Sequence, residues 1–324
     1  MLTPCHLALL LTSLAACNDP TAAEARSPPA GVQGSAGVPA SPLAPPAPPP
    51  PAPAPTPPPT VSVESARAVL FGGGGPACAD ARCLVAARYP DAPDALALYD
   101  EFGDVPGVEA AFVMDGGFRG AISIVPEWPV GRYAPKLAWV LAAQREIAAF
   151  DEALRARGAP GYRHGAVVWR FLRSKGRTTP SAYASGWEVG FNVVGSLLKT
   201  REGVRDTVFH ELFHLHDEAH GNWSRRALGP LVDALIARCG TDVECLRPYA
   251  PGGTRVRGGT WYAFQPNNGD VAHEYAAELA TRFYREWRTP PAVPFKCAAP
   301  ENMRVWQEFS AEFFGGVDPV GACP

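Results

Sequence analysis

The chain has 324 residues with 29 Lys and Arg, 32 Asp and Glu, and a formal net charge of -3 at pH 7. This near-neutral balance, with no basic stripe, argues against nucleic acid as a partner. Apolar residues make up 47% of the chain, which is usual for a globular protein. Beyond the first sixty residues no run approaches the roughly 18 consecutive apolar residues of a membrane helix. We therefore expect one large globular domain or two small ones.

The N-terminus has the features of an export signal. Leu7 to Leu11 form a short apolar run, and Leu14-Ala15-Ala16-Cys17 follows it. This tetrapeptide resembles the lipobox of bacterial lipoproteins, although no Lys or Arg precedes the apolar run. The resemblance implies that residues 1–16 are a signal peptide and that Cys17 carries the lipid. It also implies a place in the bacterial cell envelope, where Asn18 favours the outer membrane; the alternative is an ordinary secretory signal and a secreted protein.

A linker is expected between the lipid and the folded part. Residues 28–59 consist almost wholly of Pro, Ala, Gly and Ser and carry no charge. Such a segment buries too little side-chain surface to offset the entropy of ordering, so residues 17–60 are predicted to be a disordered tether. We expect residues 61–160 to form an N-terminal lobe and residues 161–324 a catalytic region, although the two can also make up one domain.

Helices and strands are both expected in the folded part. Apolar spacing predicts helices over 65–71, 79–88 and 136–157, the last ending at Gly158. Strands are predicted over 166–172 and 187–197, with another in 113–125 after a turn at Gly116-Gly117. The strand over 187–197 lies just before the motif described next. It either pairs with an extended peptide by β-augmentation or is simply an interior strand.

The segment His210-Glu211-Leu212-Phe213-His214 predicts a metal site. Residues i and i+4 share one face of a helix, so both imidazoles can reach one ion. Glu211 is then placed to take a proton from metal-activated water. The helix is expected from about Val204 to Glu218, with its apolar stripe facing away from the histidines. Asp217 lies two turns beyond His210 and is a candidate acceptor for an imidazole N–H.

A catalytic zinc ion usually needs a third protein ligand. One candidate is Glu274, on a helical stretch that runs to about Trp287, with Glu278 one turn later as partner of a ligating histidine. The other is His220, at the spacing of the HExxHxxGxxH pattern. Asp217 occupies the glycine position of that pattern and fits its left-handed turn poorly. We therefore favour Glu274 over His220.

These positions resemble a known family. HExxHxxD followed about sixty residues later by E-Y-x-A-E is similar to the gluzincin peptidases, especially the catalytic domain of anthrax lethal factor and its relatives. The resemblance covers about a quarter of the chain, from roughly Gly203 to Tyr284. It implies one zinc ion on His210, His214 and Glu274, Glu211 as general base and Glu278 beside the ligands. It also implies a tyrosine that donates to the oxyanion; Tyr262 matches best, with Tyr275 and His273 as substitutes.

Six cysteines follow Cys17 and fall into close pairs. In an exported chain an even count indicates disulfides, and pairing of neighbours closes three local loops. The expected bridges are Cys78–Cys83, Cys239–Cys245 and Cys297–Cys323. A cysteine metal site would need CxxC-type spacing, which is missing.

The sequence therefore predicts an α+β, zincin-like metalloprotease domain with a small mixed sheet over an active-site helix. The expected activity is hydrolysis of peptide bonds in a peptide or protein substrate, with the membrane contacted only through the lipid. Two other functions stay open: a catalytically inactive, surface-binding lipoprotein of the same fold, and a zinc amidase acting on cell-wall peptides.

Overall fold

A computed structural model describes residues 60–116, 120–159, 165–256, 259–266 and 269–324, and all of these belong to one compact unit of the chain. The predicted signal peptide, the lipidated Cys17 and the linker up to residue 59 lie outside the described residues. Within the described ranges, no helix combines the length and the apolar character that crossing a membrane requires.

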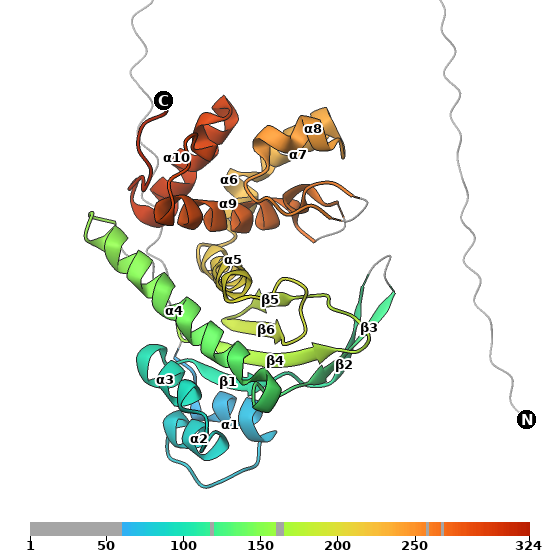
Figure 1. Ribbon diagram of the computed structural model, residues 1–324, viewed down its shortest axis with the longest axis vertical. Coiled ribbons are helices and arrows are strands. Elements are labelled where there is room, and N and C mark those ends of the chain that lie inside the picture. Colours follow the sequence, from blue (N-terminus) through green and yellow to red (C-terminus); the bar gives the residue numbers. More distant parts are fainter. Residues whose placement is uncertain (1–59, 117–119, 160–164, 257–258, 267–268) are drawn as a thin grey trace, which may run out of the picture. The chain divides into compact units, whose positions relative to one another are not determined.

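The fold is mixed α+β, with helices on either side of a sheet (Figure 1). The first half contains α1 (Val63–Phe71), α2 (Ala81–Arg88), α3 (Pro93–Phe102), β1 (Val105–Val108), β2 (Phe112–Asp115), β3 (Ala121–Pro126), α4 (Ala134–Arg155), β4 (Val168–Ser174), β5 (Ala182–Ser185) and β6 (Glu188–Asn192). The second half contains α5 (Arg201–Ala219), α6 (Trp223–Ala227), α7 (Gly229–Cys239), α8 (Val243–Leu246), α9 (Val271–Arg288) and α10 (Pro300–Phe314), with a 3-10 turn, η4 (Tyr262–Phe264), before α9.

The sheet is built around β4. β1 and β3 pair one after the other along one edge of β4, through Val105 with Val168 and Pro126 with Leu172. β6 pairs along the other edge in parallel, and β5 follows antiparallel to β6. The sheet is therefore mixed, as predicted, and residues 61–160 and 161–324 both contribute strands to it.

The strand predicted over 187–197 is shorter and lies inside the sheet. β6 ends at Asn192, where the chain turns through a hydrogen bond from Gly195 N to Asn192 O of 2.7 Å. β6 has β4 on one side and β5 on the other, so neither of its edges is open to a peptide. The predicted strand is therefore an interior strand of the sheet, and β5 is the edge strand beside it. The four-residue segment of β5 is too short for its alternation to be recognised in the sequence.

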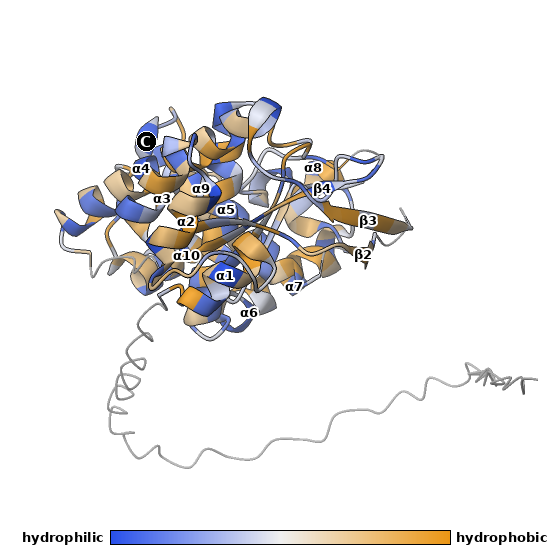
Figure 2. Cartoon of the chain, turned by 90° about the horizontal axis from the view of Figure 1, so that it is seen from below, coloured by the Kyte–Doolittle hydropathy of each residue, from blue (hydrophilic) through white to orange (hydrophobic). Residues whose placement is uncertain are grey.

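The hairpin of β2 and β3 extends from the body of the molecule and carries hydrophobic residues outward (Figure 2). The β2 side chains Phe112 and Val113 are 39% and 67% exposed, whereas Ile122 and Ile124 of β3 are buried. The turn expected at Gly116-Gly117 falls here, but Gly117 lies outside the described residues. The inner face of this hairpin contributes to the cleft described below.

α5 is buried on nearly every face. The Thr200 hydroxyl accepts a hydrogen bond from Gly203 N at 3.0 Å and caps its N-terminus. The predicted apolar stripe, which is Val204, Val208, Leu212 and Leu215, is fully buried. Phe209 and Phe213 are buried as well, because α5 lies between the sheet and helices α9 and α10 (Figure 1). Its polar side chains therefore sit in a low-dielectric interior rather than on an open face.

All three predicted disulfide bridges are confirmed. Cys78 bonds to Cys83, Cys239 to Cys245, and Cys297 to Cys323. The third bridge ties the C-terminal segment to the turn that precedes α10, and the other two close loops beside α2 and α7.

Phe150 of α4 is the aromatic centre of the helical side of the core. Its ring lies 5.7 Å from Phe209 of α5, 5.3 Å from Tyr284 and 4.9 Å from Trp287 of α9, and 5.8 Å from Phe314 of α10. One side chain thus contacts α10 and the two helices, α5 and α9, that carry the polar cluster described next.

Replacing Phe150 with Ala should lower the free energy of unfolding by about 3–5 kcal/mol, because the cavity would lie among four helices. Val113→Ala is the matched surface control and should stay within about 0.5 kcal/mol of wild type. Urea denaturation of both variants measures the difference. Equal losses would contradict the assignment of Phe150 to the core.

Candidate metal centre

Two histidines of α5 and one glutamate of α9 converge on a single point. His210 Nε2 lies 3.2 Å from His214 Nε2 and 3.3 Å from Glu274 Oε2, and His214 Nε2 lies 3.8 Å from the same oxygen. His210 and His214 are buried, and Glu274 is partly buried. This is the one group in the described ranges whose His, Cys or carboxylate atoms lie close enough together to hold a metal ion.

The spacing of these atoms fits a small divalent ion. Ligand atoms about 2.0–2.2 Å from a tetrahedral ion lie about 3.3–3.6 Å from one another. The observed separations of 3.2, 3.3 and 3.8 Å bracket this range. The donor set of two imidazoles and one carboxylate also leaves one tetrahedral position for a water or a substrate atom.

Local structure explains how the sequence brings these side chains together. On α5 the i, i+4 spacing puts both imidazoles on one side of the helix. On α9, Asp270 caps the N-terminus by accepting from Ala272 N at 3.0 Å, which places Glu274 in the first turn. α5 and α9 pack against each other, so the first turn of one helix meets the middle of the other. The predicted third ligand, Glu274, therefore joins the histidines.

The charges around His210 favour a cation. Burial lowers the pKa of His210, but its hydrogen bond to Glu274 and the charges of Glu211 and Glu278 outweigh burial and raise that pKa to about 9. Burial, with the neighbouring His210, lowers the pKa of His214 well below its ordinary value. The carboxylates around His210 thus favour a positive charge at this point, which a metal ion could supply in place of a proton, and His214 is kept in the neutral form that a ligating imidazole needs.

Glu211 is buried beside the ligands without being one of them. Burial raises its pKa to about 7, with the charge of Glu274 adding to the effect and that of His210 opposing it. A carboxylate with a pKa in this range can both accept and return a proton near neutral pH. Glu211 also lines the large cleft of the molecule, whereas the apolar stripe of α5 faces the core.

Glu278 lies one turn after Glu274 on α9 and faces His210, the predicted ligand. Its Oε1 is 3.8 Å from His210 Nδ1, which is an ion-pair contact and longer than a hydrogen bond. Its Oε2 is packed so closely on the backbone of Gly252 that a Cβ at this glycine would lie 1.2 Å from the oxygen. Gly252 therefore provides the space for Glu278. No sequence pattern indicates this contact, because the two residues are 26 positions apart.

Asp217 accepts a hydrogen bond from an imidazole, but the donor is His273. His273 Nδ1 lies 2.8 Å from Asp217 Oδ2, and the carboxylate also accepts from Ser224 N at 2.8 Å. Asp217 therefore contacts no ligand candidate through this bond and reaches the cluster only through His273. Its partner His273 stacks on the ligand candidate His214, with ring centroids 4.1 Å apart.

His220 does not join the cluster. It caps the C-terminus of α5, and its Nδ1 lies 2.8 Å from Glu312 Oε1 on α10. The alternative metal set with His220 is therefore absent from the described structure. The missing glycine explains the result: α5 continues through Asp217 to Ala219 and directs His220 toward α10.

Tyr262 is the tyrosine that approaches the cluster. It begins η4, its ring centroid lies 6.1 Å from that of His210, and it lines the cleft. Tyr275, the first substitute, is fully buried against Phe264 and does not line the cleft. The second substitute, His273, contacts Asp217 and His214, as described above.

A cleft of about 520 Å³ opens beside the cluster. Its walls come from the β2–β3 hairpin, the start of β5, helices α5 and α9, and the loop before η4. They include Met114, Ile122, Ser181, Ala182, Leu197, Asp206, His210, Glu211, Arg255, Tyr262, Glu278 and Arg285. The start of the edge strand β5 and the candidate metal site thus share one cavity, which suits an extended ligand.

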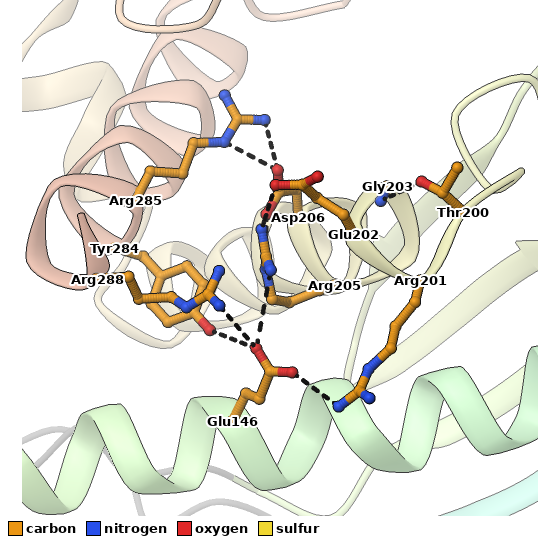
Figure 3. Close-up of polar contacts among 10 residues, drawn as sticks. All are labelled: Glu146, Thr200, Arg201, Glu202, Gly203, Arg205, Asp206, Tyr284, Arg285 and Arg288. Carbon is orange, nitrogen blue, oxygen red and sulfur yellow. Dashed lines mark hydrogen bonds and ion pairs between the residues drawn. The ribbon is translucent and has the colours of Figure 1, made fainter.

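A network of charged residues joins α4, α5 and α9 (Figure 3). Asp206 of α5 accepts from Arg285 of α9 at 2.8 Å, one turn before His210. Glu146 of α4 pairs with Arg201 at 3.0 Å, and Arg288 of α9 approaches the same carboxylate at 3.8 Å. No motif points to these residues, although Asp206 and Arg285 lie at helical spacing from His210 and Glu278. The network braces the two helices that carry the ligand candidates.

No protein-family model, characterised protein or solved structure matches this chain.

Removing Glu274 should remove the metal. Wild-type protein covering residues 61–324 is expected to contain about one divalent ion per chain, as structural and catalytic centres of this donor set do. Glu274→Ala leaves two imidazoles and should lose the ion, whereas His220→Ala should keep it. Elemental analysis under non-chelating conditions measures the content. Loss with the His220 variant alone would overturn the ligand set.

Gly252→Ala should disturb the site through Glu278. The added methyl group would overlap Glu278 Oε2, so the carboxylate must move away from His210. Changes beside metal ligands typically weaken binding about 10–100-fold, and we expect a loss in that range in a chelator competition. Gly253→Ala is the control, since a Cβ there has no neighbour within 4 Å. Equal affinities in the two variants would argue against a role for Glu278.

Proposed function

We propose that this protein is a zinc-dependent endopeptidase that hydrolyses peptide bonds. One observation carries the proposal: two imidazoles and one carboxylate lie at ligand spacing, with the buried Glu211 beside them in a large cleft. Of the common ions, zinc fits a tetrahedral set of two histidines and one glutamate with an open position. The same set, with Glu274 from a second helix, supports the gluzincin type and a zincin-like fold.

Glu211 is the general base in this mechanism. A bound zinc ion supplies the Lewis acid that lowers the pKa of a water and polarises the carbonyl group. Glu211 takes the proton from the attacking water, since burial holds its pKa near neutrality. It then returns the proton to the leaving amine. His210, His214 and Glu274 serve as ligands, and Glu278 supports His210 by its charge.

Tyr262 and the edge of the sheet position the substrate. Tyr262 lines the cleft near His210 and donates a hydrogen bond from its hydroxyl to the developing oxyanion. β5 ends the sheet on the side of α5, and Ser181 and Ala182 at its start line the cleft. An extended peptide adds to this edge by β-augmentation. The peptide is held by backbone hydrogen bonds while its side chains occupy the cleft.

The proposed setting is the bacterial cell envelope, with the domain tethered through Cys17 and the linker. Export agrees with three disulfides in the folded part, because such bridges persist in oxidising compartments. A protein substrate outside the cell or a cell-wall peptide would both be reachable from such a tether. The amidase alternative keeps the same residues and differs only in the substrate.

Glu211→Gln should abolish turnover and leave the metal bound. The change keeps the size of the side chain and removes the base, so kcat on a peptide library should fall at least about a hundredfold. Glu202→Gln makes the same chemical change on α5 at a side chain that is 76% exposed, and serves as the control. Metal content is measured in parallel.

The outcomes separate the functions. Wild-type activity in the Glu211 variant would refute the mechanism. Cleavage of cell-wall peptides but of no protein would favour the amidase. Wild-type protein that binds zinc and cleaves neither substrate class would favour the surface-binding lipoprotein.

A further inference from the structure

The orientation of His214 has an unusual basis. A metal-binding histidine normally donates its second ring N–H to a carboxylate or a carbonyl group, which fixes the plane of the ring. His214 Nδ1 is buried, and no protein group in the described ranges forms a hydrogen bond with it. The protein must therefore hold this ring by packing.

The packing partner is His273. Its ring stacks on that of His214, with centroids 4.1 Å apart and planes 21° from parallel. His273 belongs to the first turn of α9 and immediately precedes Glu274. The first turn of α9 thus supplies both the ligand candidate Glu274 and an aromatic ring, that of His273, which packs on the second ligand candidate, His214.

His273 is itself held in a fixed plane. Its Nδ1 donates to Asp217 Oδ2 at 2.8 Å. Asp217 is completely buried and accepts two further hydrogen bonds, from the backbone N–H and the hydroxyl of Ser224. Ser224 belongs to α6, so the anchor joins α6, α5 and α9. A buried carboxylate with three donors has little freedom to turn.

We propose that His273 is a positioning residue for the metal centre: anchored by Asp217, its ring fixes the plane of His214. It takes the place of the hydrogen-bond acceptor found beside most metal-binding histidines. The inference rests on the proposed metal site only in that His214 is a ligand. The side chain at position 273 provides two properties. Its flat ring packs on His214, and its N–H donor to Asp217 holds that ring in place.

Three substitutions separate these properties. His273→Phe keeps the ring and removes the donor. His273→Asn keeps a donor at the place of Nδ1 and removes the ring. His273→Ala removes both. His220→Ala is the control, because His220 caps the helix that carries His214 and contacts Glu312 instead of the cluster.

The experiment measures metal binding in the full chain, without any peptidase assay. Zinc affinity is obtained by competition with a chromophoric chelator, and the visible spectrum of the cobalt(II) protein reports the geometry of the ligands. We expect the Ala and Asn variants to bind about 10–100-fold more weakly, with an altered cobalt spectrum. The Phe variant, which keeps the ring and loses its anchor on Asp217, should lie between the Asn variant and wild type, and His220→Ala should match wild type in both measurements.

Wild-type affinity and spectrum in the Ala variant would overturn the proposal. So would an Asn variant that matches wild type while the Phe variant does not, because the donor to Asp217 would then matter and the ring would not. If the Ala variant fails to fold, the comparison of Phe with Asn still decides. A wild-type protein that binds neither ion would instead refute the metal site, and this proposal with it.

Discussion

The contact between α5 and α9 is the constraint on which the rest of the structure depends. It buries two imidazoles against three carboxylates, those of Glu211, Glu274 and Glu278. Charged groups removed from water are costly unless opposite charges or ligands compensate them. The helices must therefore meet at a separation and register that bring His210 and Glu274 within 3.3 Å. A bound cation would compensate the buried carboxylates. Occupancy of the candidate metal centre and the packing of α5 against α9 would therefore stabilise each other.

The scaffold supplies this register with both apolar and polar contacts. Phe150 of α4 packs against aromatic residues of α5, α9 and α10, which gives attraction but little directional control. The Asp206–Arg285 and Glu146 network fixes the direction, because hydrogen-bonded ion pairs require specific geometry (Figure 3). Ion pairs of this kind add little net stability when partly exposed. Their value here is in positioning one helix against the other.

The cleft is assembled from segments that are distant in sequence. The β2–β3 hairpin, the start of β5 and the loop before η4 contribute its walls, and α5 and α9 contribute its chemical groups. β5 occupies the sheet edge because β6 is enclosed between β4 and β5. Small residues make the close approaches possible, as at Gly252, where any side chain would displace Glu278. The walls of the cleft and the candidate metal site thus come from different parts of the chain and share one cavity.

The sequence by itself determined what local rules can reach. The i, i+4 spacing of His210 and His214 put both rings on one helix face, helical spacing predicted most of the long helices, and short loops between cysteines predicted the disulfides. Only the tertiary structure decided which distant residues meet. It brought Glu274 to the histidines and left His220 on Glu312, paired Asp217 with His273, and put β5 at the edge in place of the predicted strand. The periodicity of a sequence shows which residues share one face of a helix or strand. Which other helix or strand packs against that face depends on how all the elements pack into one core.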